Sequence, residues 1–127
     1  MDEPTPTEVR LRTRSRVLEV AYGPDERYEL PFEYLRVYSP SAEVRGHGPG
    51  QETLQLGKHE VRVKAVEPVG RYAVRIVFDD GHDTGLYTWG YLRELGRTRG
   101  EKWQRYLDRL AQLGIAYPTV VPAKPGR

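Results

Sequence analysis

The sequence contains no cysteine, which excludes disulfide bonds and metal sites built from thiolates. It also lacks a long hydrophobic run, because no apolar stretch approaches the roughly 20 residues that a membrane-spanning helix needs. The acidic, proline-containing start Met1-Asp2-Glu3-Pro4 does not resemble a signal peptide. We therefore expect a cytoplasmic protein that does not interact with a membrane.

A large charge excess is missing too, since 20 Lys and Arg residues face 18 Asp and Glu residues and the two signs are interspersed. The one local basic run consists of Arg10, Arg12, Arg14 and Arg16. A spacing of two places such residues on one face of a strand, where a solvated surface is the usual explanation. Binding to nucleic acid is therefore not expected.

The chain has the size and composition of one globular domain. Its 127 residues are 38% hydrophobic, which is enough apolar material for a core. Both ends are rich in proline and lack apolar periodicity. We expect a flexible N-terminal segment over residues 1–10, a folded domain over 11–114 and a flexible tail over 115–127.

The first three quarters of the folded part show the alternation of strands. Residues 16–22 and 27–30 flank a Gly-Pro-Asp turn, and residues 61–65 alternate with Val61, Val63 and Ala65 inward. The sequence Pro68-Val69-Gly70 predicts the next turn, and residues 72–78 form the clearest strand. Its expected inner face consists of Tyr72, Val74, Ile76 and Phe78.

Asp80-Gly81 predicts a tight hairpin. A type I′ turn requires positive φ at both central positions, which this pair tolerates. The turn would place Asp79 opposite His82 and Phe78 opposite Asp83, and residues 84–87 would form the returning strand.

Helices are expected in three places. Pro31 suits the first turn of a short helix that stops near Ser39. Thr88 can cap a helix over residues 89–95 that ends at Gly96. Thr98 and Glu101 match a capping box that opens a helix ending at Gly114. The order of elements predicts an α+β fold, a mostly antiparallel β-sheet with helices packed on one face and C-terminal helices.

No catalytic motif is apparent. The three histidines, His47, His59 and His82, are not followed by the x-Asp or x-Glu that a facial-triad iron oxygenase requires. Neither Ser39 nor Ser41 lies in a Gly-x-Ser-x-Gly elbow, and the glycine-rich segment 46–50 lacks the Lys-Ser/Thr of a P-loop. We therefore predict that the protein is not an enzyme.

Three motifs together are specific for a known family. They are Tyr34-Leu35-Arg36, the segment Ser-Pro-Ser-Ala-Glu-Val at 39–44 followed by Gly-His-Gly, and Phe-Asp-Asp-Gly-His-Asp at 78–83 followed by Tyr-Thr-Trp. Over roughly residues 11–113 the chain resembles the N-terminal domain of gamma-butyrobetaine hydroxylases, which also occurs alone in bacteria. The resemblance implies an α+β domain without the oxygenase barrel.

The same resemblance bears on metal binding. In the eukaryotic hydroxylases this domain holds a structural zinc through three cysteines and a histidine, whose positions correspond here to Ser39, Ser41, Val44 and His82. Serine and valine cannot replace thiolates around tetrahedral zinc. We therefore expect no zinc and no other cofactor.

Two functions follow from these patterns. The first is a non-catalytic binding or adaptor domain with a protein partner; the occurrence of related domains beside iron–sulfur ATPases suggests a link to iron or iron–sulfur metabolism. The second is a protein that binds an iron-type metal ion through histidine and carboxylate ligands. The residues available for such a site are His82, Asp80, Asp83 and His47.

The expected binding surface is a groove between the loop after residue 39 and the predicted hairpin. Its residues would be Arg36, Glu43, Arg45, His47, His82 and Trp89. The alternative is structural, with Trp89 in the core and Glu43 and Arg45 as a solvated pair.

Overall fold

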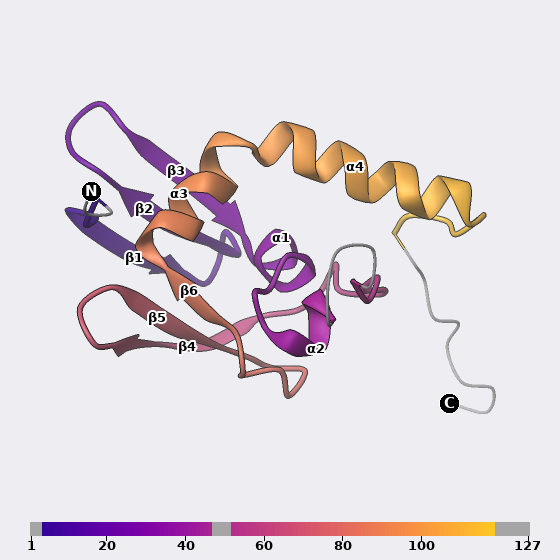
Figure 1. The fold of residues 1–127 in the computed structure, drawn as a ribbon, viewed down its shortest axis with the longest axis horizontal. Helices are drawn as coiled ribbons and strands as arrows, with labels where there is room; N and C mark the ends of the chain where they lie inside the picture. The colour runs from indigo at the N-terminus through magenta and orange to yellow at the C-terminus, as the bar shows by residue number, and fades with distance from the viewer. Residues whose placement is uncertain (1–3, 47–51, 119–127) are drawn as a thin grey trace.

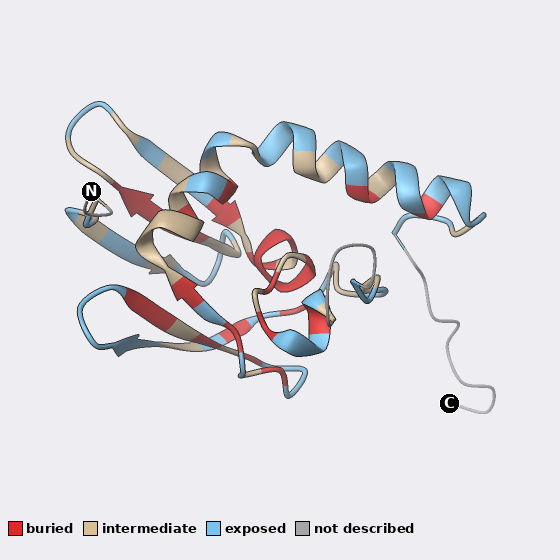
Figure 2. Ribbon diagram, in the orientation of Figure 1, coloured by how far each residue is buried: buried red, intermediate tan, exposed pale blue. Residues whose placement is uncertain are grey.

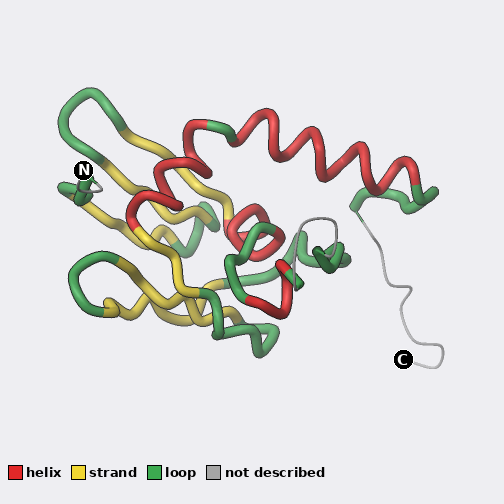
Figure 3. The backbone as a smooth tube through the Cα atoms, viewed as in Figure 1, coloured by secondary structure: helices red, strands yellow, loops and turns green. Residues whose placement is uncertain are grey.

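The computed structural model describes residues 4–46 and 52–118 (Figure 1). Within these residues the chain forms two three-stranded antiparallel sheets and four helices. The strands gather at one end of the molecule, and the last helix extends toward the other (Figure 3). The predicted α+β class and the C-terminal helices are confirmed, with the strands divided between two sheets.

The first sheet consists of β1 (Glu8–Arg12), β2 (Val17–Ala21) and β3 (Arg27–Pro31), with β2 in the centre. Strand β1 begins at Glu8, three residues before the expected start of the folded domain. It ends at Arg12, and a turn over residues 13–16 follows, in which Arg16 has a positive φ of 57°. The expected single strand face carrying Arg10 to Arg16 is therefore wrong, because a turn interrupts the run.

The second sheet consists of β4 (Val63–Val69), β5 (Ala73–Phe78) and β6 (Leu86–Thr88), in that order. Strand β4 continues through Pro68 and Val69, where a turn was predicted, and the chain reverses at Gly70 instead. Tyr72 lies in this reversal and is 65% exposed, so its assignment to the inner face is wrong. Its expected companions Val74, Ile76 and Phe78 are buried.

The predicted hairpin is confirmed in its strands, because β5 pairs antiparallel with β6 in the predicted register, with Val74 opposite Tyr87. The predicted type I′ turn at its tip is wrong. The N–H of Phe78 donates to the carbonyl of His82 over 2.9 Å, which leaves a three-residue loop, and only Gly81 in that loop has a positive φ. Asp79 cannot pair with His82, because its N–H and its carboxylate are both bonded to the backbone of Arg62.

The helices are α1 (Phe32–Val37), α2 (Ala42–Arg45), α3 (Trp89–Arg97) and α4 (Arg99–Gln112). The cap at Thr88 is confirmed, since its hydroxyl accepts the N–H of Tyr91 over 3.1 Å. The capping box is wrong, because the Thr98 hydroxyl donates backward to the carbonyl of Glu94. Gly96 lies inside α3 rather than at its end, against the ring of Tyr28.

One core joins the two sheets to α1 and α3 (Figure 2). It combines Leu18 and Leu30 of the first sheet with Ile76 and Phe78 of the second, and Leu92 of α3 contributes to it. A smaller cluster, made by Val37, Tyr106 and Leu110, attaches α4 to the end of α1. Trp103 of α4 also packs against the main core, so α4 is attached to both clusters.

Tyrosine hydroxyls form further hydrogen bonds between elements that are distant in the sequence. Tyr34 donates to the carbonyl of Leu95, Tyr87 to that of Leu35, and Tyr106 to that of Gln55, over 2.6–2.7 Å. The same kind of bond runs from Tyr38 to Lys102 and from Tyr91 to Tyr38. These bonds position α3, α4 and the segment 52–55 around α1.

Candidate functional site

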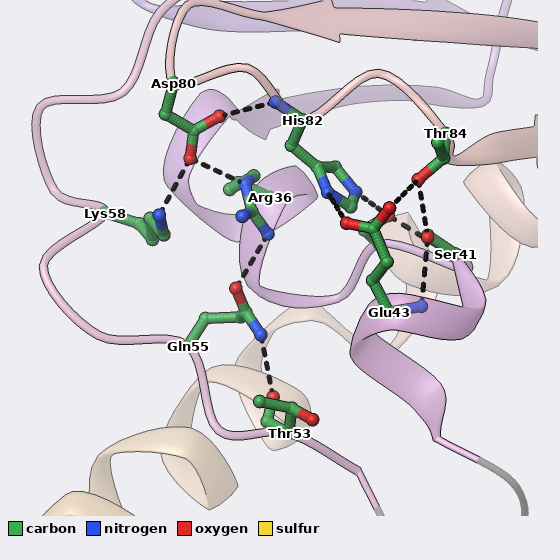
Figure 4. A network of polar contacts seen from close by, with 10 residues as sticks. Arg36, Ser41, Glu43, Thr53, Gln55, Lys58, Asp80, His82 and Thr84 are labelled. Carbon is green, nitrogen blue, oxygen red and sulfur yellow. Dashed lines mark hydrogen bonds and ion pairs between the residues drawn. The ribbon is translucent and has the colours of Figure 1, made fainter.

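A polar cluster forms where the end of α1 and the start of α2 meet the loop after β5 (Figure 4). Arg36 comes from α1, Glu43 from α2, and Asp80 and His82 from the loop. Ser41 caps α2 by accepting the N–H of Glu43, and this cap directs the carboxylate of Glu43 toward the loop.

The centre of the cluster is a row of three side chains. The Oγ of Ser39 lies 2.8 Å from Nε2 of His82, and Nδ1 of His82 lies 3.4 Å from Oε2 of Glu43. Burial, and then the guanidinium of Arg36, lower the pKa of His82 and outweigh the opposite effects of Glu43 and Asp80. In neutral His82 the proton lies on Nδ1, because the facing carboxylate can only accept, and Nε2 accepts from Ser39.

Asp80 forms the second half of the cluster. Its carboxylate accepts from Arg36 over 2.9 Å, from Lys58 over 2.8 Å and from the N–H of His82 over 3.2 Å. Burial raises the pKa of Asp80, but these hydrogen bonds outweigh it and hold the pKa at about 2. Arg36 also donates to Gln55 over 2.8 Å, so the cluster connects α1 with the segment before β4.

A Ser–His–Glu row has the order of a hydrolytic triad, and the sequence contained no spacing that predicted it. However, Ser39 is 1% exposed, and its oxygen also accepts the N–H of Ser41. A nucleophile needs a path to its substrate and a free approach to its oxygen. In the conformation observed, the row therefore binds the end of α1 to the loop rather than presenting a nucleophile.

The residues at the zinc positions of the related hydroxylases do not fit zinc. Ser39 and His82 bond directly to each other, Ser41 bonds to Thr84 over 2.7 Å, and Val44 is a buried apolar side chain. Hydroxyl and alkyl groups do not supply the anionic sulfur that this kind of site requires. Among residues 4–46 and 52–118, no group of three or more His, Asp or Glu residues is placed to hold a metal ion.

The residues predicted to bind an iron-type metal ion are bonded to other protein groups, or lie apart from one another. Asp80 is bonded to Arg36 and Lys58, whereas Asp83 lies 3.7 Å from Arg75. Both ring nitrogens of His82 face protein groups. His47 lies outside the described residues.

Some of the residues predicted to line a groove lie close together, and others do not. Arg36, Glu43 and His82 belong to the polar cluster. Arg45 lies over the ring of Tyr91 at 5.0 Å from its centroid, facing a different part of the surface. Trp89 packs against the core and donates to the carbonyl of Arg71, at the end of β5 and β6 that is remote from His82.

Sequence reasoning missed a hollow of about 690 Å³ beside the cluster, bordered by the end of α1, α2, residues 52–55 and α4. Its apolar wall consists of Val37, Val44, Leu54 and Tyr106. Its basic residues are Arg45, Lys102, Arg105 and Arg109. The last three recur at helical spacing along one side of α4, which was the available signal in the sequence.

No helix within the described ranges 4–46 and 52–118 is long and apolar enough to cross a bilayer. No curated protein matches the chain.

Solved structures of similar chains exist. One solution structure is 43% identical, with a TM-score of 0.80 and coverage of 99% of this chain and 100% of the other. A second solution structure is 42% identical, with a TM-score of 0.78 and coverage of 99% and 95%. A crystal structure of a DUF971-family protein of unknown function from Acidithiobacillus ferrooxidans is 41% identical, with a TM-score of 0.62 and coverage of 75% and 98%.

The family described as gamma-butyrobetaine hydroxylase-like, N-terminal, matches residues 9–93. This range contains both sheets apart from Glu8, together with α1, α2 and every residue of the polar cluster. The chain belongs to the gamma-butyrobetaine hydroxylase-like N-terminal domain family.

Proposed function

We propose that this protein is a non-catalytic binding module, and that a protein partner docks in the hollow between α2 and α4. The observation that carries the proposal is the contrast between two neighbouring regions. The polar cluster is internally bonded, whereas the hollow of about 690 Å³ is open and has an apolar wall. Concave apolar surfaces with a few polar groups at their rim are where ligands and partners bind.

The hollow is held in shape before anything binds. Tyr38, Tyr91 and Tyr106 line it, and each hydroxyl donates to a backbone carbonyl over 2.5–2.6 Å. A preformed site loses less conformational entropy on binding than a site that must be ordered first. This rigidity favours a dedicated binding surface.

The absence of catalysis is part of the same proposal. Ser39 is buried, both ring nitrogens of His82 face protein groups, and Asp80 is engaged by two cations, so these groups stabilise the fold. For the process served, we propose iron or iron–sulfur metabolism, which rests on the family resemblance alone. Among residues 4–46 and 52–118, the candidate ligands of the alternative, an iron-type site at His82, are engaged by other protein groups.

The test is to place a photo-crosslinking amino acid at position 94, in the lining of the hollow, and at position 111, an exposed position of α4 outside the lining, as the control. We expect one protein to be cross-linked from position 94 only. That protein is then purified, and its affinity is compared for Leu54→Asp, inside the hollow, and for Leu56→Asp, which is exposed outside it.

We expect Leu54→Asp to weaken binding about tenfold or more, because it places a charge in the apolar wall. Leu56→Asp should bind like the wild type. Equal effects of the two variants, or equal cross-linking from both positions, would contradict a partner in the hollow.

A further inference from the structure

Building on the proposed function, we propose that the partner presents an acidic segment to the hollow. Arg45, Arg105 and Arg109 bind its carboxylates, and the apolar wall covers its hydrophobic side chains.

The first support is that these three arginines lack carboxylate partners. Within residues 4–46 and 52–118, none of them takes part in an ion pair. By contrast, Arg36 and Arg93 are engaged by Asp80 and Glu26 at 2.7–2.9 Å.

The second support is the way the cations converge. Arg105 and Arg109 lie one turn apart on α4, and Arg45 lies on α2 at the same hollow. Lys102 adds a fourth positive charge, although Glu94 lies 4.0 Å from it. The acidic residues of the lining are Glu52 and Glu94, so the hollow carries an excess of two positive charges (four basic minus two acidic).

The third support concerns the chemistry of the ligand. A planar guanidinium binds a carboxylate through two parallel hydrogen bonds, and three such groups prefer an anionic ligand. A small inorganic anion would leave Leu54, which is half-buried in the lining, in contact with water. A peptide that combines carboxylates with apolar side chains satisfies both parts of the surface.

The test uses the whole protein, labelled for NMR, and two short peptides that alternate leucine with glutamate or with lysine. We expect the glutamate peptide to shift the amide signals of Arg45, Leu54, Arg105 and Arg109 in a saturable manner. Added salt should weaken this binding, because salt screens exposed charges. The lysine peptide should not bind there.

The matched variants are Arg105→Gln with Arg109→Gln, and Arg14→Gln with Arg62→Gln as the control. Both pairs remove two positive charges, and Arg14 and Arg62 are exposed outside the hollow. We expect the first pair to lower the affinity for the glutamate peptide about tenfold or more, and the control pair to leave it nearly unchanged. An equal loss of affinity in both pairs would show that the peptide responds only to the net charge of the protein, and it would overturn the proposal.

Two further results would overturn it. One is a glutamate peptide that binds no tighter than the lysine peptide. The other is inorganic phosphate or citrate that shifts the same signals with equal affinity, which would indicate a small-anion site. If a cross-linked partner depended on Leu54 but not on Arg105 and Arg109, the docking site would stand and the acidic segment would be wrong. If the glutamate peptide bound to the hollow but no partner were cross-linked, the preference for an acidic ligand would stand and the docking of a protein partner would be wrong.

Discussion

The Oγ of Ser39 lies 2.8 Å from Nε2 of His82, although the two residues are 43 positions apart in the chain. This bond connects the end of α1 to the loop between β5 and β6. In the related hydroxylases, by the resemblance described above, the same two positions hold zinc. Here a hydrogen bond joins them.

Ser39→Ala is expected to destabilise the protein by about 1–3 kcal/mol, because it leaves the buried Nε2 of His82 without a partner. The free energy of unfolding in denaturant measures the effect. Ser15→Ala, at an exposed position, is the control and should change stability by less than about 0.5 kcal/mol. Equal stability of the two variants would show that the bond contributes nothing.

His82 makes stability depend on pH. Its pKa is lowered in the folded protein, mainly by burial and then by Arg36, from the ordinary value of 6.5. As the pH falls, the unfolded chain therefore binds the proton first. Stability should be full above pH 6.5 and decrease as the pH falls through 6.5 toward the lowered value.

The measurement is the free energy of unfolding between about pH 8 and about pH 5. His82→Gln should reduce the slope in this range. A slope that is the same in wild type and His82→Gln would assign the pH dependence to other groups.

Two glycines at helical positions should respond in opposite ways to alanine. In Gly96→Ala the new Cβ would lie 2.3 Å from the ring of Tyr28, and the overpacking should cost about 1–3 kcal/mol. At Gly100, in the first turn of α4, a Cβ meets nothing within 4 Å, so Gly100→Ala should stabilise by about 0.5–1 kcal/mol. Thermal unfolding of the two variants measures this contrast, and shifts in the same direction would contradict it.

Tyr87→Phe tests how much the hydrogen bonds of the buried tyrosine hydroxyls contribute to stability. The hydroxyl of Tyr87 is buried and donates to the carbonyl of Leu35 over 2.6 Å, so its removal should cost about 1–3 kcal/mol. Tyr72→Phe is the matched control, because Tyr72 is exposed. Denaturant unfolding compares the two, and equal stability of both variants would mean that the buried bond adds no net stability.

Metal removal should leave the fold intact. Ser39, Ser41 and Val44 provide no thiolates, so the thermal unfolding midpoint should be the same with and without a strong chelator. Elemental analysis of protein purified without added metal should find no stoichiometric zinc. Tightly held zinc at one equivalent would refute this reading of the three positions.

Much of the core followed from local patterns. Phe32 and Leu35 at helical spacing, and Val74, Ile76 and Phe78 at strand spacing, are buried as expected. The helix cap at Thr88 could also be predicted, because the start of a helix depends on residues that are close in the sequence. Such features reflect hydrogen bonding and burial within a few positions of the chain.

Other features depended on partners distant in the sequence. Glu19 is buried because Arg12 and Arg27 from the flanking strands pair with it. Asp79 leaves the predicted turn because Arg62 of another segment binds it. No periodicity along the chain contains this information.

The sequence by itself determined the α+β class, most of the core positions and, through its motifs, the family. Only the tertiary structure decided that Ser39, His82 and Glu43 form a bonded row, and that Arg45 lies at the same hollow as Arg105 and Arg109. The physical reason is that element type follows from local backbone and burial preferences. The meeting of side chains from α2 and α4 requires the packing of the whole chain.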